Sequence, residues 1–391
     1  MNYGKLMDSL LKGEVDRDFV KGNSALIIKD GKELYYNNFG YADAENGILM
    51  KRDTIIRLFS MTKPITAVAA MIAQERGLID LLDPVSKYLP EYADMNVISP
   101  DGSLKKASKQ ITIMNLLTMT SGIPYGEDWE GCSASGIRMN KIMSEIVDGL
   151  NKGERLSTRE VVRKIAANPL AFEPGERWMY GLSADILATI IEIATGVRYG
   201  EFLKKEIFDR LQMPDTGFYV PEEKWDRFAM SYEEDENGSL VARDGSHLAE
   251  YYHEDVAYEA GGCGLVSTID DIAHFALMLA QGGTYMGQKI ISSSSVKFLT
   301  TNHLTPVQMG SLEWDSTLGY GYGGLMRVLV SQSMAGSQAS LGEFGWDGWT
   351  GNYMAVDPEK QLIILYFIQK RGAGTTPVVR KIRAATYGYI D

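Results

Sequence analysis

Leu58-Phe59-Ser60-Met61-Thr62-Lys63-Pro64 is the most informative stretch of this 391-residue chain. It places a serine and a lysine three residues apart, where an apolar, strand-like run over residues 54–59 gives way to a helical pattern. Residues at i and i+3 share one face of a helix, so the Lys63 amine can reach the Ser60 hydroxyl. A serine is a weak nucleophile until a base takes its proton, and a desolvated lysine can be that base. The pair therefore predicts nucleophilic catalysis.

The surroundings of Ser60 distinguish it, because the same spacing occurs four times in the chain. The segment from Ser60 to about Gly77 is apolar on most faces, which predicts a buried helix with Pro64 in its first turn. A purely structural alternative is that Ser60 only caps this helix. The other three pairs lie in polar settings and are interpreted as solvated surface: Ser9/Lys12, Ser103/Lys106 and Ser294/Lys297.

Composition and charge limit the kinds of partner. The net charge of −12, without Lys/Arg clusters, argues against nucleic acid and anionic membrane surfaces. No run approaches the roughly 18 apolar residues of a membrane-spanning helix. The first residues show no signal-peptide pattern, which favours the cytoplasm. The four histidines lack metal-ligand spacing, so we expect neither a metal site nor a cofactor.

The order of strand-like and helical segments predicts two substructures. The simplest assembly is one sheet built from residues 1–95 and 225–391, with a helical domain over residues 96–224 inserted between them. The glycine-rich segment 319–324 is interpreted as the start of a strand and not as a phosphate loop, because no helix follows it. The expected strands are 23–30, 32–41, 322–330, 351–357 and 362–369, and the expected helices are 60–77, 112–118, 137–150, 157–167, 183–195, 270–281 and 378–389.

Four further blocks follow Ser60 and Lys63: 116–122 (LLTMTSG), 172–180 (FEPGERWMY), 261–271 (GGCGLVSTIDD) and 345–358 (GWDGWTGNYMAVDP). Together, and in this order, they resemble the β-lactamase-like serine hydrolases, which share the S-x-x-K signature. The resemblance covers roughly residues 20 to 390. It points most to the group that contains family VIII carboxylesterases, related to class C β-lactamases and to peptidases that handle D-amino acids.

The resemblance implies both a fold and catalytic roles. The fold would be α+β (α/β) of the β-lactamase/transpeptidase type: an antiparallel sheet flanked by helices, plus an all-helical domain, with the active site between them. Ser60 would be the nucleophile, Lys63 its base or proton relay, and Tyr180 a second general acid/base, although alone Tyr180 could be a core aromatic. A packed Lys–Tyr pair can shift its pKa values from near 10 toward a usable range. The backbone N–H groups of Ser60 and Trp349 would hold the oxyanion.

Departures from the family pattern narrow the substrate. Leu182 stands where β-lactamases and DD-peptidases carry an asparagine, and it has no amide to bind an acylamino group. Trp346-Asp347-Gly348 replaces Lys-Thr-Gly, so the lysine that pairs with a substrate carboxylate is missing, and Asp347 would repel such a group if it faces the site. We therefore count Leu182, Trp346, Asp347 and Gly348 as candidate substrate-binding residues. Met119 replaces the usual histidine.

These observations predict a cytoplasmic carboxylesterase that cleaves a neutral small-molecule ester through a Ser60 acyl-enzyme. The competing functions use the same Ser-Lys-Tyr groups: a β-lactamase, a D-aminopeptidase or DD-peptidase-like hydrolase, or an acyltransferase that passes the acyl group to an alcohol. A binding protein without activity would be expected to have lost Ser60, Lys63 or Tyr180.

Overall fold

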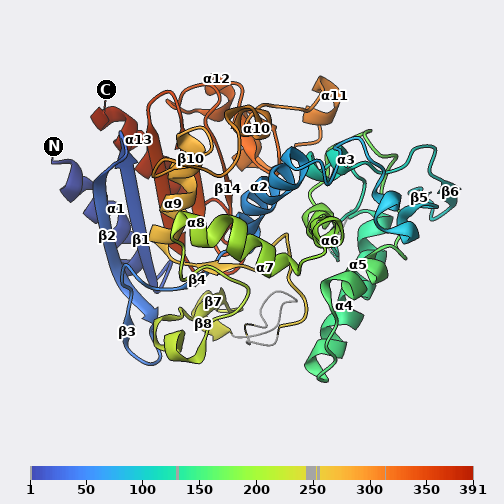
Figure 1. The fold of residues 1–391 in the computed structure, drawn as a ribbon. Coiled ribbons are helices and arrows are strands. Elements are labelled where there is room, and N and C mark those ends of the chain that lie inside the picture. Colours follow the sequence, from blue (N-terminus) through green and yellow to red (C-terminus); the bar gives the residue numbers. More distant parts are fainter. Residues whose placement is uncertain (1, 129–131, 244–251, 253–255, 313, 391) are drawn as a thin grey trace.

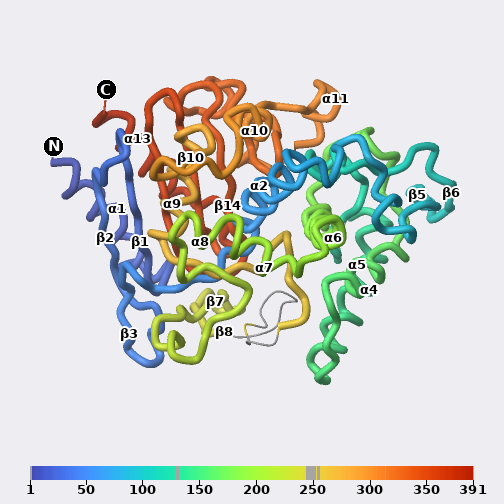
Figure 2. The backbone as a smooth tube through the Cα atoms, in the orientation of Figure 1, coloured from blue at the N-terminus to red at the C-terminus, as the bar shows by residue number. Residues whose placement is uncertain are grey.

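An eight-stranded antiparallel sheet forms the centre of this computed structural model (Figure 1). The structure describes residues 2–128, 132–243, 252, 256–312 and 314–390. The strand order is β12-β13-β14-β15-β16-β1-β2-β3, so the two ends of the chain meet where β1 pairs with β16, as the blue and red segments of Figure 2 show. The strands are β1 (Gly22–Lys29), β2 (Lys32–Asp43), β3 (Ile48–Leu49), β12 (Tyr320–Tyr322), β13 (Arg327–Leu329), β14 (Phe344–Asp347), β15 (Tyr353–Asp357) and β16 (Leu362–Ile368).

Helices cover both faces of this sheet, because its central strands are apolar on both sides. Every residue of β15 and β16 is buried. The helices α1 (Tyr3–Asp16) and α13 (Pro377–Ile390) pack together on one face. The helices α2 (Thr62–Glu75) and α9 (Ile269–Ala280) join the larger core on the other face. The prediction of one sheet from both ends of the chain is confirmed.

The helical part of the chain lies beside the sheet, on the side away from α1 and α13 (Figure 1). Its central helix is α6 (Ser183–Thr195), which packs against α2, α3 (Ile113–Leu117) and α5 (Thr158–Ile165). The bounds of α6 are those that the sequence predicts, because Gly196 ends the helix with a φ of 67°. Through its contacts with α6 and β14, α2 connects the helical part to the sheet.

One predicted strand is a hairpin instead. The sequence predicts a single strand over 322–330, but the chain reverses between β12 and β13, which pair antiparallel. At the reversal Leu325 has a φ of 55°, and the Gly323 N–H donates to the Met326 carbonyl at 2.8 Å. The apolar run continues through the turn, so hydrophobic pattern alone does not reveal it. The interpretation of 319–324 as the start of a strand is confirmed by β12.

The remaining elements are short ribbons and helices. No helix among the described residues combines the length and apolar character needed to cross a membrane. The ribbons are β4–β9 (Ile56–Arg57, Val266–Ser267), β5–β6 (Asn96–Ile98, Leu104–Lys106), β7–β8 (Ser231–Glu234, Leu240–Arg243) and β10–β11 (Thr284–Tyr285, Gln288–Lys289). The helices are α4 (Ala134–Asn151), α7 (Tyr199–Leu203), α8 (Asp209–Leu211), α10 (Ser293–Leu299), α11 (Pro306–Met309) and α12 (Gln332–Ala335).

Candidate active site

Ser60 lies in a single 3₁₀ turn, Phe59–Met61, directly in front of α2. The helix predicted to open at Ser60 thus begins at Thr62, and Ser60 itself is half-buried. Phe59 has a φ of 46°, in the left-handed region that a bulky side chain rarely adopts. Such strain persists only where the surroundings enforce it, and it is typical of functional sites. The turn presents the Ser60 hydroxyl next to the first turn of α2.

Lys63 is fully buried in the first turn of α2. Its amine donates to the Ser60 hydroxyl at 3.2 Å, to the Tyr125 hydroxyl at 2.9 Å and to the Gly262 carbonyl at 2.8 Å. An ammonium has three N–H donors, so all three have acceptors. The i and i+3 spacing predicted contact between Lys63 and Ser60, and the structure shows that contact.

Two tyrosine rings lie against the Lys63 amine in different ways. The Tyr125 hydroxyl is hydrogen-bonded to it, whereas Tyr180 presents the face of its ring, with the amine 4.5 Å from the ring centroid. The Tyr180 hydroxyl accepts a hydrogen bond from the Trp346 indole N–H at 3.0 Å. Burial, and then the neighbouring Tyr180, raises the pKa of Tyr125 well above its usual range, so Tyr125 keeps its proton.

Tyr125 is a site residue that the sequence reasoning missed. It lies in an irregular loop, and its contact with Lys63 arises only from the tertiary fold. The available signal was its position, three residues after the block 116–122 ends. The same block also supports Tyr180, because the Met119 carbonyl accepts the Met179 N–H at 2.9 Å. Met119 itself is fully buried, with a φ of 53°.

An aromatic cluster surrounds Tyr180. Trp314 meets the Tyr180 ring edge-on, with centroids 4.9 Å apart, and 43% of its surface is exposed. Trp349 is 40% exposed and packs edge-on against Phe59, the residue before Ser60, with centroids 5.2 Å apart. Both tryptophans therefore offer apolar surface near Ser60. The buried members of the cluster are Trp178, Tyr322 and Trp346.

The end of β14 comes close to the segment that carries Ser60 because Gly348 has no side chain. A Cβ on Gly348 would lie 2.6 Å from the Leu58 carbonyl oxygen, so only glycine permits this approach. Asn352 fixes the same turn by donating to the Arg57 carbonyl at 2.7 Å. Trp349, the predicted second oxyanion donor, follows Gly348 and contacts Phe59. The structure thus brings the segments of both predicted oxyanion donors together.

Two predicted substrate-binding residues lie elsewhere. Trp346 faces Tyr180, so the next residue along β14, Asp347, faces the opposite side of the sheet. There its carboxylate accepts hydrogen bonds from the buried Arg327 and from Thr375. Leu182 is 2% exposed and belongs to the main core. Asp347 was expected to repel an anionic substrate only if it faces the site, and here Arg327 balances its charge.

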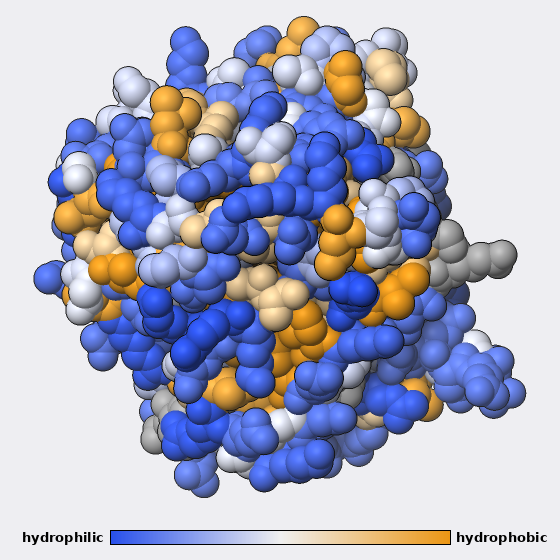
Figure 3. Space-filling view, turned by 90° about the vertical axis from the view of Figure 1, so that its right-hand side faces the viewer, coloured by the Kyte–Doolittle hydropathy of each residue, from blue (hydrophilic) through white to orange (hydrophobic). Residues whose placement is uncertain are grey.

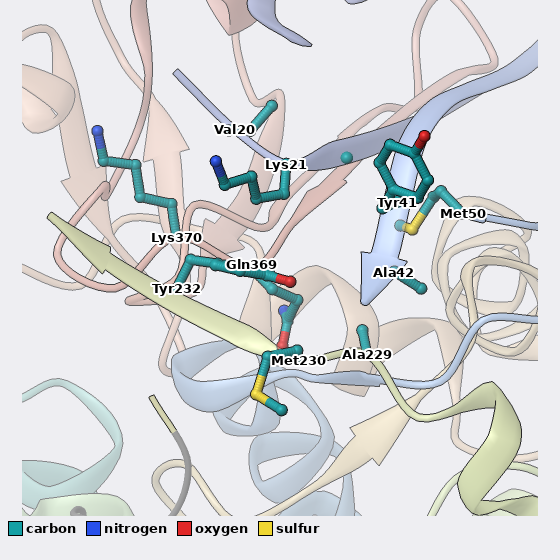
Figure 4. A pocket seen from close by; sticks show the side chains of 11 residues that line it. Val20, Lys21, Tyr41, Ala42, Met50, Ala229, Met230, Tyr232, Gln369 and Lys370 are labelled. Atoms are coloured by element: carbon teal, nitrogen blue, oxygen red, sulfur yellow. The ribbon is translucent and has the colours of Figure 1, made fainter. Parts of the chain in front are cut away.

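The molecule also has exposed apolar side chains on the helical side and a small pocket away from Ser60. Figure 3 shows apolar side chains exposed among hydrophilic ones on the face that lies to the right in Figure 1. The pocket in Figure 4 lies at β1 and β2, between residues such as Tyr41, Tyr232 and Lys370. Its lining includes neither Ser60 nor Lys63, so it is distinct from the candidate site.

Comparison with known proteins identifies the family. The family model described as Beta-lactamase matches residues 7–387. The chain belongs to the β-lactamase family. This β-lactamase-family chain is 29% identical to Esterase EstB of Burkholderia gladioli over 94% of its own length and 90% of that protein. It is 28% identical to Penicillin-binding protein 4* of Bacillus subtilis, over 88% and 67% of the two chains. The solved structure of "EstCE1, a hydrolase with promiscuous acyltransferase activity" matches with a TM-score of 0.81 and 25% identity, over 99% and 98% of the chains.

The predicted β-lactamase/transpeptidase-like fold is confirmed, and the β-lactamase-family chain is a serine hydrolase. The geometry suits that chemistry. A neutral Lys63 amine that donates to Tyr125 and Gly262 keeps one lone pair for the proton of the Ser60 hydroxyl. The Ser60 oxygen can then attack a carbonyl carbon.

Proposed function

We propose that this serine hydrolase is a carboxylesterase of the family VIII type, which cleaves neutral, apolar esters through an acyl-enzyme on Ser60. The observation that carries the proposal is the apolar aromatic surface beside Ser60, formed by the half-exposed Trp314 and Trp349. Such surface favours an apolar acyl or alcohol group. The names of Esterase EstB and EstCE1 support the same class.

The proposed cycle uses the described contacts. Ser60 attacks the ester carbonyl while its proton passes to the Lys63 amine, and the backbone N–H groups of Ser60 and Trp349 stabilise the oxyanion. The leaving alcohol takes that proton back from the Lys63 ammonium, directly or through the Tyr180 hydroxyl, and the acyl group stays on Ser60 as an ester. Water then attacks this ester while the neutral Lys63 amine, with Tyr180, takes the water proton. The bond from the acyl carbon to the Ser60 oxygen breaks, that oxygen regains the proton, and the carboxylic acid is released.

The decisive experiment is to trap the acyl group. Wild-type protein should hydrolyse a short p-nitrophenyl ester and gain the mass of one acyl group. After digestion, that mass should be found on the peptide that contains Ser60. Ser60→Ala should abolish both signals. Ser294→Ala is the matched control, because Ser294 belongs to another S-x-x-K sequence but is exposed on α10, and it should keep full activity. Undiminished turnover by Ser60→Ala would refute the proposal.

Assays with other substrates separate the alternative functions. The turnover of nitrocefin with no turnover of esters would indicate a β-lactamase, and release of D-alanine from a peptide would indicate a DD-peptidase. An acceptor alcohol that diverts most of the acyl group into a new ester would indicate an acyltransferase, a possibility supported by the promiscuous acyltransferase activity for which EstCE1 is described. We expect ester hydrolysis to dominate in the absence of an added alcohol.

A further inference from the structure

A buried carboxylate lies behind Lys63 and has no part in the steps described above. Asp185, in the first turn of α6, is fully buried. Its Oδ1 accepts hydrogen bonds from the Tyr258 hydroxyl at 2.7 Å and from the Gly262 N–H at 3.3 Å. Its Oδ2 has no hydrogen-bond partner among the described residues. A buried carboxylate oxygen without a partner is costly, so its retention calls for an explanation.

Gly262 connects this carboxylate to the catalytic amine. Its N–H points to Asp185, and its carbonyl accepts from Lys63 at 2.8 Å. A Cβ on Gly262 would lie 2.6 Å from the Asp185 Oδ2, so only glycine lets the carboxylate approach this closely. The segment is also fixed to α2, because the Thr66 hydroxyl donates to the Gly261 carbonyl at 2.6 Å. The carboxylate and the amine are thus held on the two sides of one residue.

We propose that Asp185 is a positioning residue for Lys63: its negative charge stabilises the ammonium that Lys63 becomes when it takes the Ser60 proton, and through Gly262 it fixes the amine's place. The inference rests on the proposed roles of Ser60 and Lys63. In the step itself, the Ser60 O–H bond breaks, a bond forms from that oxygen to the substrate carbon, and the proton adds to the Lys63 nitrogen. Asp185 touches neither the substrate nor Ser60.

The other titratable groups around the pair are tyrosines and one thiol. Tyr92, Tyr125, Tyr199 and Tyr258 all lie within electrostatic reach of Asp185, and burial raises the pKa of each above its ordinary value. The four hydroxyls therefore keep their protons over the whole pH range of the assay. Cys263 lies near Tyr125 and Tyr258. For Asp185, burial raises the pKa of the carboxyl and the positive charge of Lys63 opposes that rise. This direction agrees with the geometry, in which Gly262 contacts both groups.

Asp185→Asn removes the charge and preserves the shape. Without the carboxylate, the neutral amine of Lys63 is reached at lower pH, so the acid limb of the kcat/KM profile should move toward acid by on the order of one pH unit. The plateau should fall by about tenfold or more, because the developing ammonium loses its stabilising charge. Both are measured with p-nitrophenyl acetate at the isosbestic wavelength, between about pH 5 and 9. A residue needed only for stability would lower the melting temperature and the plateau but leave the limb in place.

Two further variants keep the test decisive. Asp271→Asn is the matched control, because Asp271 is another buried carboxylate, on α9, that accepts from Thr216, and it should leave the profile unmoved. Tyr258→Phe removes only one donor to Asp185 and should move the limb the same way by less, which tests the idea if Asp185→Asn does not fold. An unmoved limb in the folded variants would overturn the proposal. Acyl trapping on Ser60 in those variants would show at the same time that the proposed function still stands.

Discussion

The Trp346 side chain is the direct hydrogen-bond partner of the Tyr180 hydroxyl, at 3.0 Å. A tyrosine that exchanges protons must keep its hydroxyl in place, and an indole N–H that donates to it also stabilises its deprotonated form. Trp346→Phe keeps the aromatic packing and removes this donor. We expect kcat for a short ester to fall about tenfold with KM little changed, which is about the value of one hydrogen bond.

Trp178→Phe provides the comparison. Trp178 stacks on Tyr180 with centroids 6.1 Å apart, but its buried indole N–H has no hydrogen-bond partner among the described residues. The Trp178→Phe variant should therefore keep kcat near the wild-type value. Equal losses in the two variants would mean that aromatic packing, and not the hydrogen bond, supports Tyr180.

For single residues, the sequence predicted the contacts that follow from local spacing along the chain. Ser60 and Lys63 are neighbours on one helical turn, so their contact follows from the i and i+3 rule. Tyr125 reaches Lys63 from a loop 62 residues away in the chain, and no periodicity encodes that contact. The orientation of Asp347 was within reach of the sequence, because a strand alternates its side chains and Trp346 was expected at the site.

Among the elements, the turn after β14 sets the position of the second predicted oxyanion donor. Gly348→Ala would place a methyl group 2.6 Å from the Leu58 carbonyl oxygen. This oxygen belongs to the backbone, so it cannot rotate away as the end of a side chain can. We expect the turn to shift and the Trp349 N–H to lose its alignment, with kcat lower by about a hundredfold.

The measurement is kcat for the same ester, alongside a thermal melt that separates misalignment from unfolding. Gly388→Ala is the control, because a Cβ on this helical glycine in α13 meets nothing within 4 Å. That variant should keep wild-type activity and gain helix propensity. Full activity of Gly348→Ala would show that the turn tolerates a methyl group.

Elements with clear end signals were predicted more closely than those whose ends depend on tertiary contacts. The helix α5 begins after Ser157, whose hydroxyl and the Glu160 side chain form a capping box, so its start is encoded locally. The start of α2 is different, because the strained Phe59 delays the helix until Thr62. The reversal between β12 and β13 was missed for a related reason, since strand pairing there decides the turn.

The stability of the whole molecule should respond to pH through Asp271. Burial raises the pKa of its carboxyl from 3.8 to about 6. A carboxyl with a higher pKa in the folded state binds its proton more tightly there, so its contribution is full below the unfolded value and is lost as pH rises through about 6. Asp271→Asn should therefore gain stability relative to wild type between pH 5 and 8, by about 1.4 kcal/mol.

Urea unfolding of both proteins at the two pH values checks this expectation. The informative quantity is the change with pH in the difference between their free energies of unfolding, because the substitution also alters contacts that do not titrate. A difference that stays constant from pH 5 to 8 would mean that Asp271 is ionised equally in both states.

The pairing of β1 with β16 has a consequence for the chain during synthesis. Ser60 and Lys63 are made first, and the turn that carries Trp349 is held in the sheet by β15 and β16, which are made much later. A nascent chain thus contains Ser60 and Lys63 before it contains the segment of the second predicted oxyanion donor. Hydrolase activity should therefore first arise when residues up to about 368 have been made and are free to pair.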